Sequence, residues 1–332
     1  MKGFTGAAWR RLHSATAAGA VALSVLAAMP ACAADASAAL TWTTLGTAAG
    51  PVLYAERSQP ANLLSVDGRP WLIDCGDGAL ERLAALHLRA AQIDTVVISH
   101  LHMDHIGGLQ GLLGLRWMQN AKRKLTIYGP PGTDAVVAGL VASLKPVAAI
   151  DGKQAGHGDP ATMVDVVTLR DGADIDVQGV RLRAVRNSHF DVTPGHPLEN
   201  GTQSLSLRFD YKGRAIGYTG DTGPSDAVAR LEQGVDVLVS EVIDIEPTIA
   251  GIAQAMGRMS PDAREHLIEH LKTQHLTPRE AGALATKANA KQLVFTHLAI
   301  AGSTDGSRDT LINGAKETFD GPVAVAHDLD RF

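Results

Sequence analysis

The chain has 332 residues, of which 45% are hydrophobic and 20% charged, a composition typical of a globular protein with one large domain or two ordinary ones. This balance excludes a chain that is mainly disordered, collagen-like or coiled-coil. The net charge of −5 and the aromatic content of 4% also disfavour a protein that coats nucleic acid through basic patches or base-stacking platforms.

The first 33 residues have the pattern of a secretory signal peptide. A basic segment that ends in Arg10 and Arg11 precedes a short apolar run at residues 15–28. The sequence Ala-Cys-Ala at residues 31–33 fits the small-residue rule of a cleavage site. We therefore expect cleavage after residue 33 and a periplasmic or secreted protein.

Removal of the signal leaves a mature chain with a net charge of −8, because residues 1–33 carry three positive charges and no negative one. An uncleaved membrane anchor and a lipoprotein attached at Cys32 are the alternatives, and the general secretory and twin-arginine routes both stay open. No other stretch has 18 uninterrupted apolar residues, so we expect no membrane contact after cleavage. Cys75 is then the only cysteine, which excludes an internal disulfide.

Short β-branched runs alternate with amphipathic segments along residues 40–332, which predicts a single domain of the α/β (α+β) class. Strands are predicted, in chain order, at residues 95–98, 125–128, 180–185, 204–209, 235–239, 293–295 and 323–326. Helices are predicted at residues 79–89, 108–120, 134–144, 226–233, 262–274, 278–290 and 309–319. Residues 146–165 are rich in Gly, Asp, Pro and Ala, and are predicted to form a surface loop.

Three histidines and an aspartate follow the strand predicted at residues 95–98. His100, His102, Asp104 and His105 form an H-x-H-x-D-H sequence, and this density of imidazole and carboxylate groups is typical of a site for divalent metal ions. Residues two apart at a strand end point the same way, so His100 and His102 can bind one ion. A turn into a helix would carry Asp104 and His105 toward a second ion. A histidine-rich loop without metal is the alternative.

This sequence resembles the metal-binding motif of the metallo-β-lactamase superfamily, and the chain supplies similar partners in the same order. Asp74, in the sequence L-I-D-C-G-D-G, resembles the aspartate that supports the metal loop. His189, Asp221 and His297 each follow a strand-like run and resemble the remaining ligands. His196 is an alternative to His189.

The resemblance covers roughly residues 40–332 and implies a four-layer αββα sandwich with two divalent cations. Zinc is favoured, and manganese or iron(II) are alternatives. The implied ligands are His100, His102, His189 and Asp221 for one ion, and Asp104, His105, Asp221 and His297 for the other. Two such ions supply a hydroxide nucleophile for hydrolysis, and Asp104 is expected to take part in catalysis as well.

Residues 236–241 and 274–282 are similar to motifs of one branch of this superfamily, which contains ribonuclease Z, arylsulfatase-like and phosphodiesterase-like enzymes. In that branch a histidine before a helix, paired with a glutamate, assists the leaving group, and here these are His275 and Glu241. A carboxylate can fix an imidazole tautomer, and a protonated histidine can donate to a departing oxygen. A solvated His275, and a Glu241 that lies on the surface or only supports a neighbour, are the alternatives.

Ribonuclease Z holds tRNA with a protruding basic, glycine-rich arm, whereas residues 146–165 contain one lysine and three aspartates. We therefore predict an exported dinuclear-metal hydrolase of small anionic esters, such as phosphodiesters or aryl sulfates, with no nucleic-acid partner. A homodimer is left open. A lactonase or β-lactamase on the same fold, and a non-catalytic periplasmic metal-binding module, are the alternatives.

A second histidine pair stands apart from these motifs. His266, Glu269 and His270 match the H-x-x-E-H pattern of inverted zinc peptidases, and the two histidines are one helical turn apart. This is one short match, whereas the other site draws on five separated segments, so we expect an exposed helix face here.

Overall fold

The computed structural model describes residues 39–191, 201, 203–257, 259–300 and 304–332. The signal peptide expected at residues 1–33 and the alternative ligand His196 lie outside these residues.

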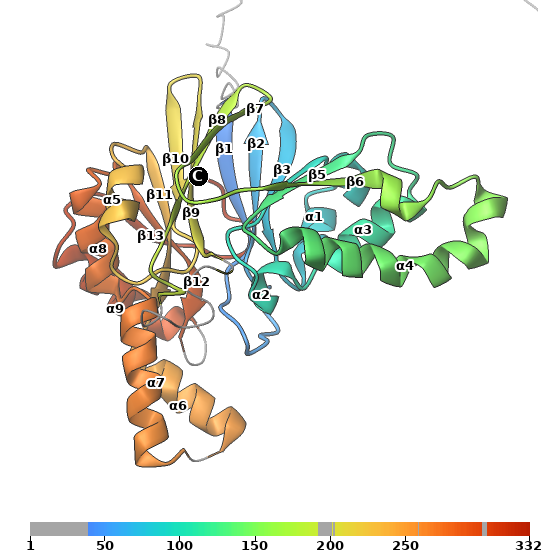
Figure 1. Ribbon diagram of the computed structural model, residues 1–332. Helices are drawn as coiled ribbons and strands as arrows, with labels where there is room; N and C mark the ends of the chain where they lie inside the picture. The colour runs from blue at the N-terminus through green and yellow to red at the C-terminus, as the bar shows by residue number, and fades with distance from the viewer. Residues whose placement is uncertain (1–38, 192–200, 202, 258, 301–303) are drawn as a thin grey trace, which may run out of the picture. The chain divides into compact units, whose positions relative to one another are not determined.

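The strands form two mixed sheets, and each sheet uses one continuous half of the chain (Figure 1). The first sheet has the order β1-β2-β3-β4-β5-β6 and contains β1 (Leu40–Gly46), β2 (Ala61–Val66), β3 (Arg69–Cys75), β4 (Thr95–Val97), β5 (Leu125–Gly129) and β6 (Val164–Thr168). The second has the order β13-β12-β11-β10-β9-β8-β7 and contains β7 (Ala173–Val177), β8 (Val180–Arg186), β9 (Leu205–Tyr211), β10 (Arg214–Tyr218), β11 (Val237–Ile243), β12 (Leu293–Ala299) and β13 (Val323–Val325).

Each sheet begins with antiparallel pairs and continues with parallel ones. Strands β1 to β3 and β7 to β10 pair antiparallel, while β3 to β6 and β10 to β13 pair parallel. A parallel pair needs a crossover connection, commonly a helix. The carboxyl ends of the parallel strands then lie at one edge of each sheet, where loops are free to carry functional side chains.

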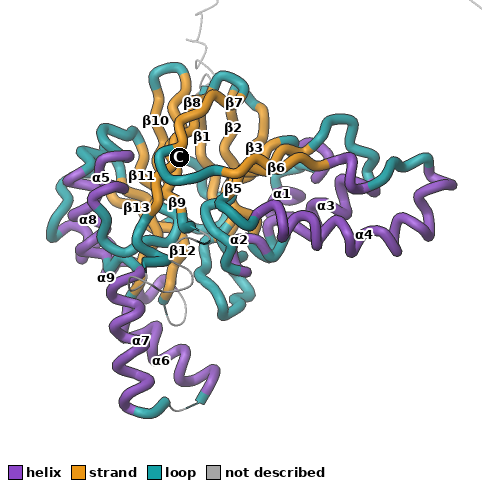
Figure 2. The backbone as a smooth tube through the Cα atoms, viewed as in Figure 1, coloured by secondary structure: helices purple, strands orange, loops and turns teal. Residues whose placement is uncertain are grey.

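Helices cover the outer face of each sheet (Figures 1 and 2). The first sheet carries α1 (Ala79–Ala85), α3 (Leu109–Met118) and α4 (Thr133–Ala155), and the second carries α5 (Asp226–Leu231), α8 (Pro278–Lys287) and α9 (Thr304–Lys316). The short elements are α2 (Met103–Ile106) and the 3-10 turns η1 (Ala90–Gln92) and η2 (Pro160–Met163). Two further helices, α6 (Ile245–Met256) and α7 (Pro261–Gln274), form a hairpin that projects away from the sheets (Figure 1).

Alternating side chains divide the apolar residues of the sheets between a central core and a core under the helices of each sheet. In β12, Val294 packs between the two sheets, whereas Leu293 and Phe295 pack under the helices of the second sheet. In β4, Val97 joins the central core, whereas Val96 packs under the helices of the first sheet. The central strands of both sheets are therefore buried on two faces, which produces the layer order helix, sheet, sheet, helix. The predicted four-layer αββα sandwich is confirmed.

The prediction of a surface loop at residues 146–165 is wrong. Helix α4 continues through Pro146 to Ala155, η2 follows, and β6 begins at Val164. A proline inside a helix removes one backbone hydrogen bond, which is why the sequence indicated an end near residue 144. The alanine-rich residues that follow favour helix and carry it onward.

By length and composition alone, the segment Thr133–Ile150 of α4 qualifies as a membrane span among the described residues. Its mean hydropathy is 1.5, and 22% of it is buried. One such helix is weak evidence for a membrane span, because helices that do not cross a membrane can have the same length and composition. Val137, Val141 and Leu144 are buried in the core under the first sheet, which gives α4 the periodic apolar face of a layer helix.

Glu232, directly after α5, is a buried acid without a hydrogen-bond partner among the described residues. Its carboxylate lies against the backbone of Gly217 in β10, where the Cβ of any other residue would collide with it. Burial raises the pKa of Glu232 well above its usual value of 4.5, against the opposing effect of Arg208. Glu232 is therefore protonated in the folded state under conditions where the unfolded chain has lost that proton.

We expect Glu232→Gln to stabilise the protein at neutral pH. Because the unfolded state binds fewer protons than the folded state above about pH 4.5, the free energy of unfolding of the wild type falls as the pH rises toward the raised pKa. The variant has no such proton, so its advantage should be small near pH 4 and about 1–3 kcal/mol near pH 8. Urea unfolding across this range measures the difference, with the exposed Glu265→Gln as control. A difference independent of pH would contradict the assignment.

Candidate metal centre and active site

The H-x-H-x-D-H segment leaves the carboxyl end of β4 and turns into α2. His102 is the N-cap residue of α2, and Asp104 and His105 lie in its single turn. Because a tight helical turn follows an extended segment, the side chains before and within α2 point to different places. His100 and His102 join one group of close metal-ligand atoms, and Asp104 and His105 join another.

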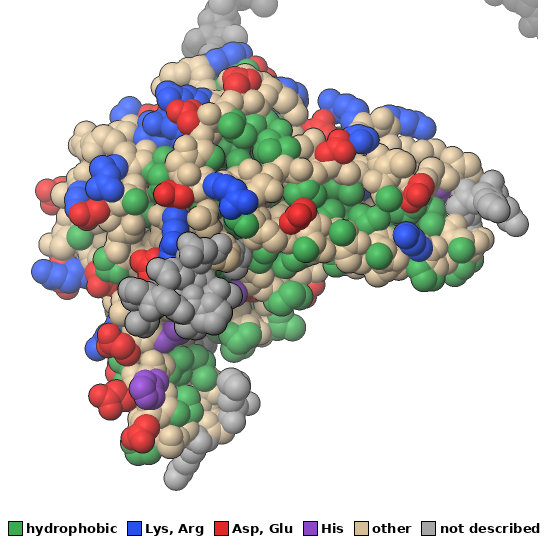
Figure 3. All heavy atoms as spheres, viewed as in Figure 1, with side chains coloured by type: hydrophobic (Ala, Val, Ile, Leu, Met, Phe, Trp, Pro, Cys, Tyr) green, Lys and Arg blue, Asp and Glu red, His purple; other side chains and the backbone are tan. Residues whose placement is uncertain are grey.

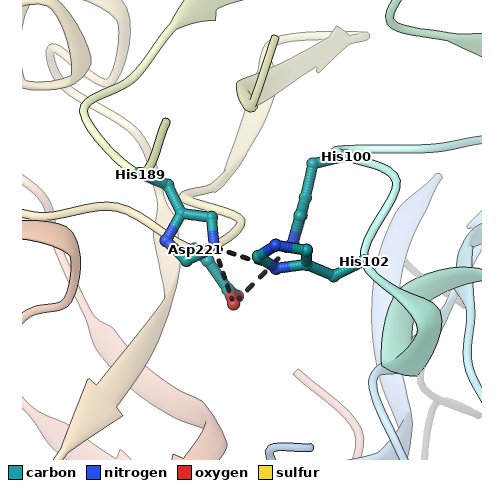
Figure 4. Close-up of side chains that lie close together, drawn as sticks. All are labelled: His100, His102, His189 and Asp221. Carbon is teal, nitrogen blue, oxygen red and sulfur yellow. Dashed lines mark hydrogen bonds and ion pairs between the residues drawn. The ribbon is translucent and has the colours of Figure 1, made fainter. Parts of the chain in front are cut away.

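The first group contains His100, His102, His189 and Asp221 (Figure 4), and its candidate ligand atoms all lie within 4.8 Å of one another. The Nε2 atoms of His100 and His189 are each 3.8 Å from Asp221 Oδ2. His189 Nε2 is also 3.1 Å from His102 Nδ1. His189 follows β8 and Asp221 follows β10, so this group joins side chains from both sheets.

The second group contains Asp104, His105 and His297. Asp104 Oδ2 is 3.4 Å from His297 Nε2 and 3.7 Å from His105 Nε2. Asp221 also reaches this group, because its Oδ1 lies 3.3 Å from His105 Nε2 and its Oδ2 lies 3.1 Å from His297 Nε2. The seven residues expected as ligands are thus gathered around the Asp221 carboxylate, which contacts both groups.

Two residues of this centre have a left-handed backbone that is rare outside glycine. His297 has φ 43°, next to a shift of register between β11 and β12, and Asp74 has φ 55° at the end of β3. Such conformations cost of order 1–3 kcal/mol each and persist where packing and hydrogen bonds determine them. They turn both side chains toward the edge of the sheets where the loops meet.

Asp74 fixes the orientation of His105. Its Oδ1 accepts the Ser99 amide at 2.7 Å, and its Oδ2 lies 2.8 Å from His105 Nδ1. A carboxylate at one imidazole nitrogen sets the tautomer and directs the other nitrogen toward a metal ion. Here that other nitrogen, Nε2, faces Asp221.

Two supporting residues, Tyr218 and Gly50, are not identified by any sequence motif. The Tyr218 hydroxyl donates to Asp74 Oδ2 at 2.8 Å from the opposite sheet, and the Gly50 amide donates to Asp104 Oδ2 at 2.9 Å. These partners are 144 and 54 residues apart in sequence. The one available signal was the position of Tyr218 directly before the Thr-Gly-Asp sequence that ends in Asp221.

Burial determines the charge of the first group of histidines. It lowers the pKa of His100 and His102, and it lowers the pKa of His189 to about 3. These imidazoles are neutral at pH 7, so their ring nitrogens have lone pairs, which metal ligation requires.

The carboxylates determine the charge of the second group. Burial lowers the pKa of His297, but Asp221 and Asp104 outweigh that effect and raise it to about 10. The pKa of His105 is raised well above its usual range by the same two carboxylates, again against burial. Burial also opposes ionisation of Asp221, but the nearby imidazoles hold its pKa well below the usual range. Protonated imidazoles balance the buried negative charge here, a role that cations would take over.

Several buried ligand atoms have no hydrogen-bond partner among the described residues. They are His100 Nε2, His105 Nε2, Asp221 Oδ1 and both ring nitrogens of His297. Buried polar atoms are rarely left unpaired in proteins, and a cluster of them indicates a missing ion or ligand. Imidazole nitrogen with carboxylate oxygen is a donor set that suits divalent transition metals, so these residues could hold divalent metal ions.

His275 and Glu241 form a buried pair beside this centre. His275 directly follows α7 and its side chain is 11% exposed, while Glu241 in β11 is fully buried. Glu241 Oε2 lies 2.7 Å from His275 Nδ1, and its Oε1 accepts the Thr222 amide at 2.6 Å. The alternatives of a solvated His275 and a surface Glu241 are therefore wrong.

The pair also shares its electrostatics with the centre. Burial lowers the pKa of His275, but Glu241 outweighs it and raises that pKa above the usual value. Burial raises the pKa of Glu241, against the effect of His275. Since Glu241 engages Nδ1, the Nε2 atom of His275 is the one left for a substrate.

A cavity of about 650 Å³ opens over the centre. His102, Asp104, His189, Asp221, His275 and His297 line it on the side of the metal groups. Gly50 and Pro51, and residues of the α6–α7 hairpin, complete the lining. His270 of the H-x-x-E-H sequence also lines the cavity, but neither it nor His266 belongs to a group of three close ligand atoms among the described residues.

The wall that carries Gly50 is anchored by Asp328, near the C-terminal end of the chain. Asp328 Oδ1 accepts the amide and the hydroxyl of Thr47 at 3.0 and 2.7 Å, and its Oδ2 accepts the Ser58 amide at 2.7 Å. Arg82 Nε donates to the same Oδ2 at 2.9 Å. Both ends of the segment 47–58 are thus attached to one carboxylate that is 5% exposed.

We expect Asp328→Ala to destabilise the protein by about 2–4 kcal/mol, because it leaves buried donors and a cation without their acceptor. Amide hydrogen exchange should become faster in residues 47–58 before it does elsewhere. Thermal unfolding and exchange followed by mass spectrometry measure the two effects, with the half-exposed Asp330→Ala as control. Unchanged exchange in that segment would show that Asp328 is not its anchor.

The chain is similar to one family of known proteins, both by a family model and by individual relatives. The model of the β-lactamase superfamily domain matches residues 69–298. The chain is 33% identical over 298 residues to ribonuclease Z of Mycobacterium avium, covering 87% of this chain and 96% of the relative. It is 31% identical over 320 residues to ribonuclease Z of Bacillus mycoides, covering 87% and 97%.

Solved structures share the fold at lower identity. The metallo-β-lactamase fold protein YhfI from Bacillus subtilis has a TM-score of 0.64 at 20% identity, covering 88% of this chain and 98% of that chain. The short form of human tRNase Z has a TM-score of 0.59 at 23% identity, with the same coverage.

Proposed function

Because the chain belongs to the β-lactamase superfamily, as a metal-dependent hydrolase homologous to ribonuclease Z, we propose that it cleaves phosphodiester bonds in RNA with two zinc ions at its metal centre. The observation that carries the proposal is the position of the His275–Glu241 pair beside seven ligand residues gathered around Asp221. A group that can protonate a leaving oxygen thus lies next to a site for divalent cations, which is the arrangement that ester hydrolysis needs.

From the sequence, small anionic esters are predicted as substrates and no nucleic-acid partner is expected, with lactones, β-lactams or a non-catalytic role as alternatives. That prediction is wrong, because the relatives matched over nearly their whole length are ribonuclease Z proteins. The prediction of no nucleic-acid partner relied on the net charge of −8 of the mature chain and on the lack of a basic arm at residues 146–165. Net charge describes the whole surface, whereas the charge that meets a phosphate is local to the site.

The residues of the site would have three roles in the proposed reaction: metal binding, proton donation and positioning of the proton donor. The seven ligand residues would hold two zinc ions, which when bound supply a hydroxide nucleophile and polarise a phosphoryl oxygen. His275 would give its Nε2 proton to the oxygen that leaves phosphorus as the P–O bond breaks. Glu241 would hold the ring through Nδ1, and the Thr222 amide holds Glu241 in turn.

The proposal is tested with a labelled single-stranded RNA oligonucleotide and its DNA counterpart. We expect the zinc-loaded protein to cleave the RNA, to lose that activity after EDTA treatment, and to regain it with zinc. Elemental analysis should find about two zinc ions per chain, and fewer in the His102→Ala variant. Correctly folded, metal-loaded protein that leaves every RNA intact would overturn the proposal.

We also propose that residues 1–33 direct export, on the strength of the signal-peptide pattern given above. The full chain expressed in a bacterium should then be found in the periplasmic fraction, with Ala34 as its first residue by mass spectrometry. A protein that stays in the cytoplasm with its N-terminus intact would contradict this. Replacing Arg10 and Arg11 by Lys distinguishes the twin-arginine route, which requires the arginine pair, from the general one.

A further inference from the structure

We propose that the α6–α7 hairpin, together with Pro51 and Met103, forms a subsite for one unpaired nucleobase beside the metal centre. The base would belong to the nucleoside that departs with the leaving oxygen. This inference rests on the proposed function and adds to it where the substrate is held and which part of the substrate is recognised.

The hairpin is held firmly enough to serve as a wall. Ile249 of α6 and Leu271 of α7 are buried together with Ile243 at the end of β11. The Thr248 hydroxyl lies 2.6 Å from both the Asp244 and the Ala299 carbonyl oxygens, which ties α6 to the end of β12. Side chains positioned by packing in this way lose little entropy when a ligand binds.

The face that the hairpin turns to the cavity is apolar. Ile252 of α6 and Leu267 and Leu271 of α7 line it. Pro51 and Met103 also line the cavity, and Met103 is 72% exposed although it is a large apolar residue. Figure 3 shows hydrophobic side chains gathered between the two helices, with acidic ones along the outer side of α7. An exposed apolar surface next to a catalytic centre is typical of a ligand-binding wall.

The charge of the cavity favours a base over a run of phosphates. No Lys or Arg is among the described residues that line it, whereas tracking a nucleic-acid backbone depends on such residues. The flat faces of a nucleobase are apolar and bind against apolar side chains irrespective of sequence. A volume of about 650 Å³ is also within the range of sites for small ligands and has room for a nucleotide at the scissile bond, but none for a duplex.

The position of His275 assigns this wall to the leaving-group side. Helix α7 ends at Gln274 and His275 follows it directly, so the apolar residues of α7 lead along one wall to the proposed proton donor. A group bound against Leu267 and Leu271 is therefore attached to the oxygen that His275 would protonate. His270, on the same wall, offers ring nitrogens to the polar edge of a base.

Cleavage of short single-stranded RNAs with one abasic site tests the assignment. We expect an abasic residue on the leaving-group side to raise KM about tenfold or more, and one on the other side to change it little. Leu267→Ala combined with Ile252→Ala should raise KM on intact RNA by about tenfold and remove the effect of the abasic site. His266→Ala, on the same helix but outside the cavity lining, should behave like the wild type.

Two outcomes separate this inference from the proposed function. If RNA is cleaved but neither the hairpin variants nor the abasic sites change KM, the subsite is wrong and the proposed function stands. If no RNA is cleaved, binding of adenosine monophosphate and ribose 5-phosphate to the zinc-loaded protein is compared by calorimetry. Tighter binding of the nucleotide, lost in the double variant, would support the subsite, and equal affinities would overturn it. Circular dichroism and zinc content of each variant establish that it is folded and loaded.

Discussion

Asp221→Asn should reduce kcat by at least about 10³-fold and lower the zinc content of the purified protein, because residues that only support metal ligands already cost about 10–100-fold when changed. The Asp221 carboxylate lies within 4 Å of His100, His105, His189 and His297, and so contacts both candidate metal groups. Asparagine keeps the size of the side chain and removes its negative charge. The two positions would then lose the anion they share, and two cations close together would repel each other.

The measurement combines elemental analysis with the rate of RNA cleavage. Asp165→Asn is the matched control, since that aspartate is exposed and pairs with Lys124 far from the cavity. Retention of two zinc ions and of full activity by the Asp221 variant would contradict a shared carboxylate. Loss of only one ion with partial activity would place Asp221 on a single metal.

His275→Ala should have the second largest effect, a loss of about 10²–10⁴-fold in kcat on RNA, the usual contribution of a general acid. The loss should be much smaller on an ester with a 4-nitrophenyl leaving group, because that phenolate departs without a proton. Zinc content should not change, since His275 is absent from the groups of close ligand atoms among the described residues.

Glu241→Gln supplies the positioning test for the same pair. A neutral amide still contacts Nδ1 but no longer holds a protonated ring, so we expect a smaller loss in kcat and a shift of the alkaline limb of the pH–rate profile to lower pH. His266→Ala serves again as the histidine control. An equal loss with both leaving groups in the His275 variant would show that His275 does not act as the acid.

The candidate ligand residues were within reach of sequence reasoning because their signal is local. His100 to His105 lie within six positions. His189 and Asp221 each follow a strand, and His297 lies within β12. The structure brings all of them to the edge where parallel strands end. Tyr218, Gly50 and Asp328 were missed because each acts across a large sequence distance on a residue that no local pattern identifies.

Strand β1 and helix α6 were not predictable from the sequence, because each depends on contacts with distant parts of the chain. Strand β1 is buried along its whole length although three of its residues are threonines. Thr44 is tolerated there because its hydroxyl donates to the His327 carbonyl at 2.7 Å, a contact made by the far end of the chain. Helix α6 lacks a side-chain hydrogen bond at its N-cap residue Asp244, and Pro247 lies in its first turn, so its start is not marked by a capping motif. Its apolar side chains pack against α7 or line the cavity, and neither contact can be read from the sequence of α6 alone.

The substrate was the weakest prediction because it is decided by surfaces outside the metal centre. The same ligand arrangement suits several kinds of ester, and fold does not fix function. The helices that line the cavity were only half predicted, α7 but not α6. The apolar character of their shared wall is visible only after the chain has folded.

The division of the chain into two consecutive sheets, joined by the short turn between β6 and β7, has a consequence for assembly. The first half contributes His100, His102, Asp104 and His105, and the second contributes His189, Asp221 and His297. A polypeptide cut near Gly172 should therefore yield two fragments that are inert alone. Fragment complementation tests this. If activity returns when the two pieces are co-expressed and supplied with zinc, the active site is assembled between the two sheets from residues that neither piece contains alone.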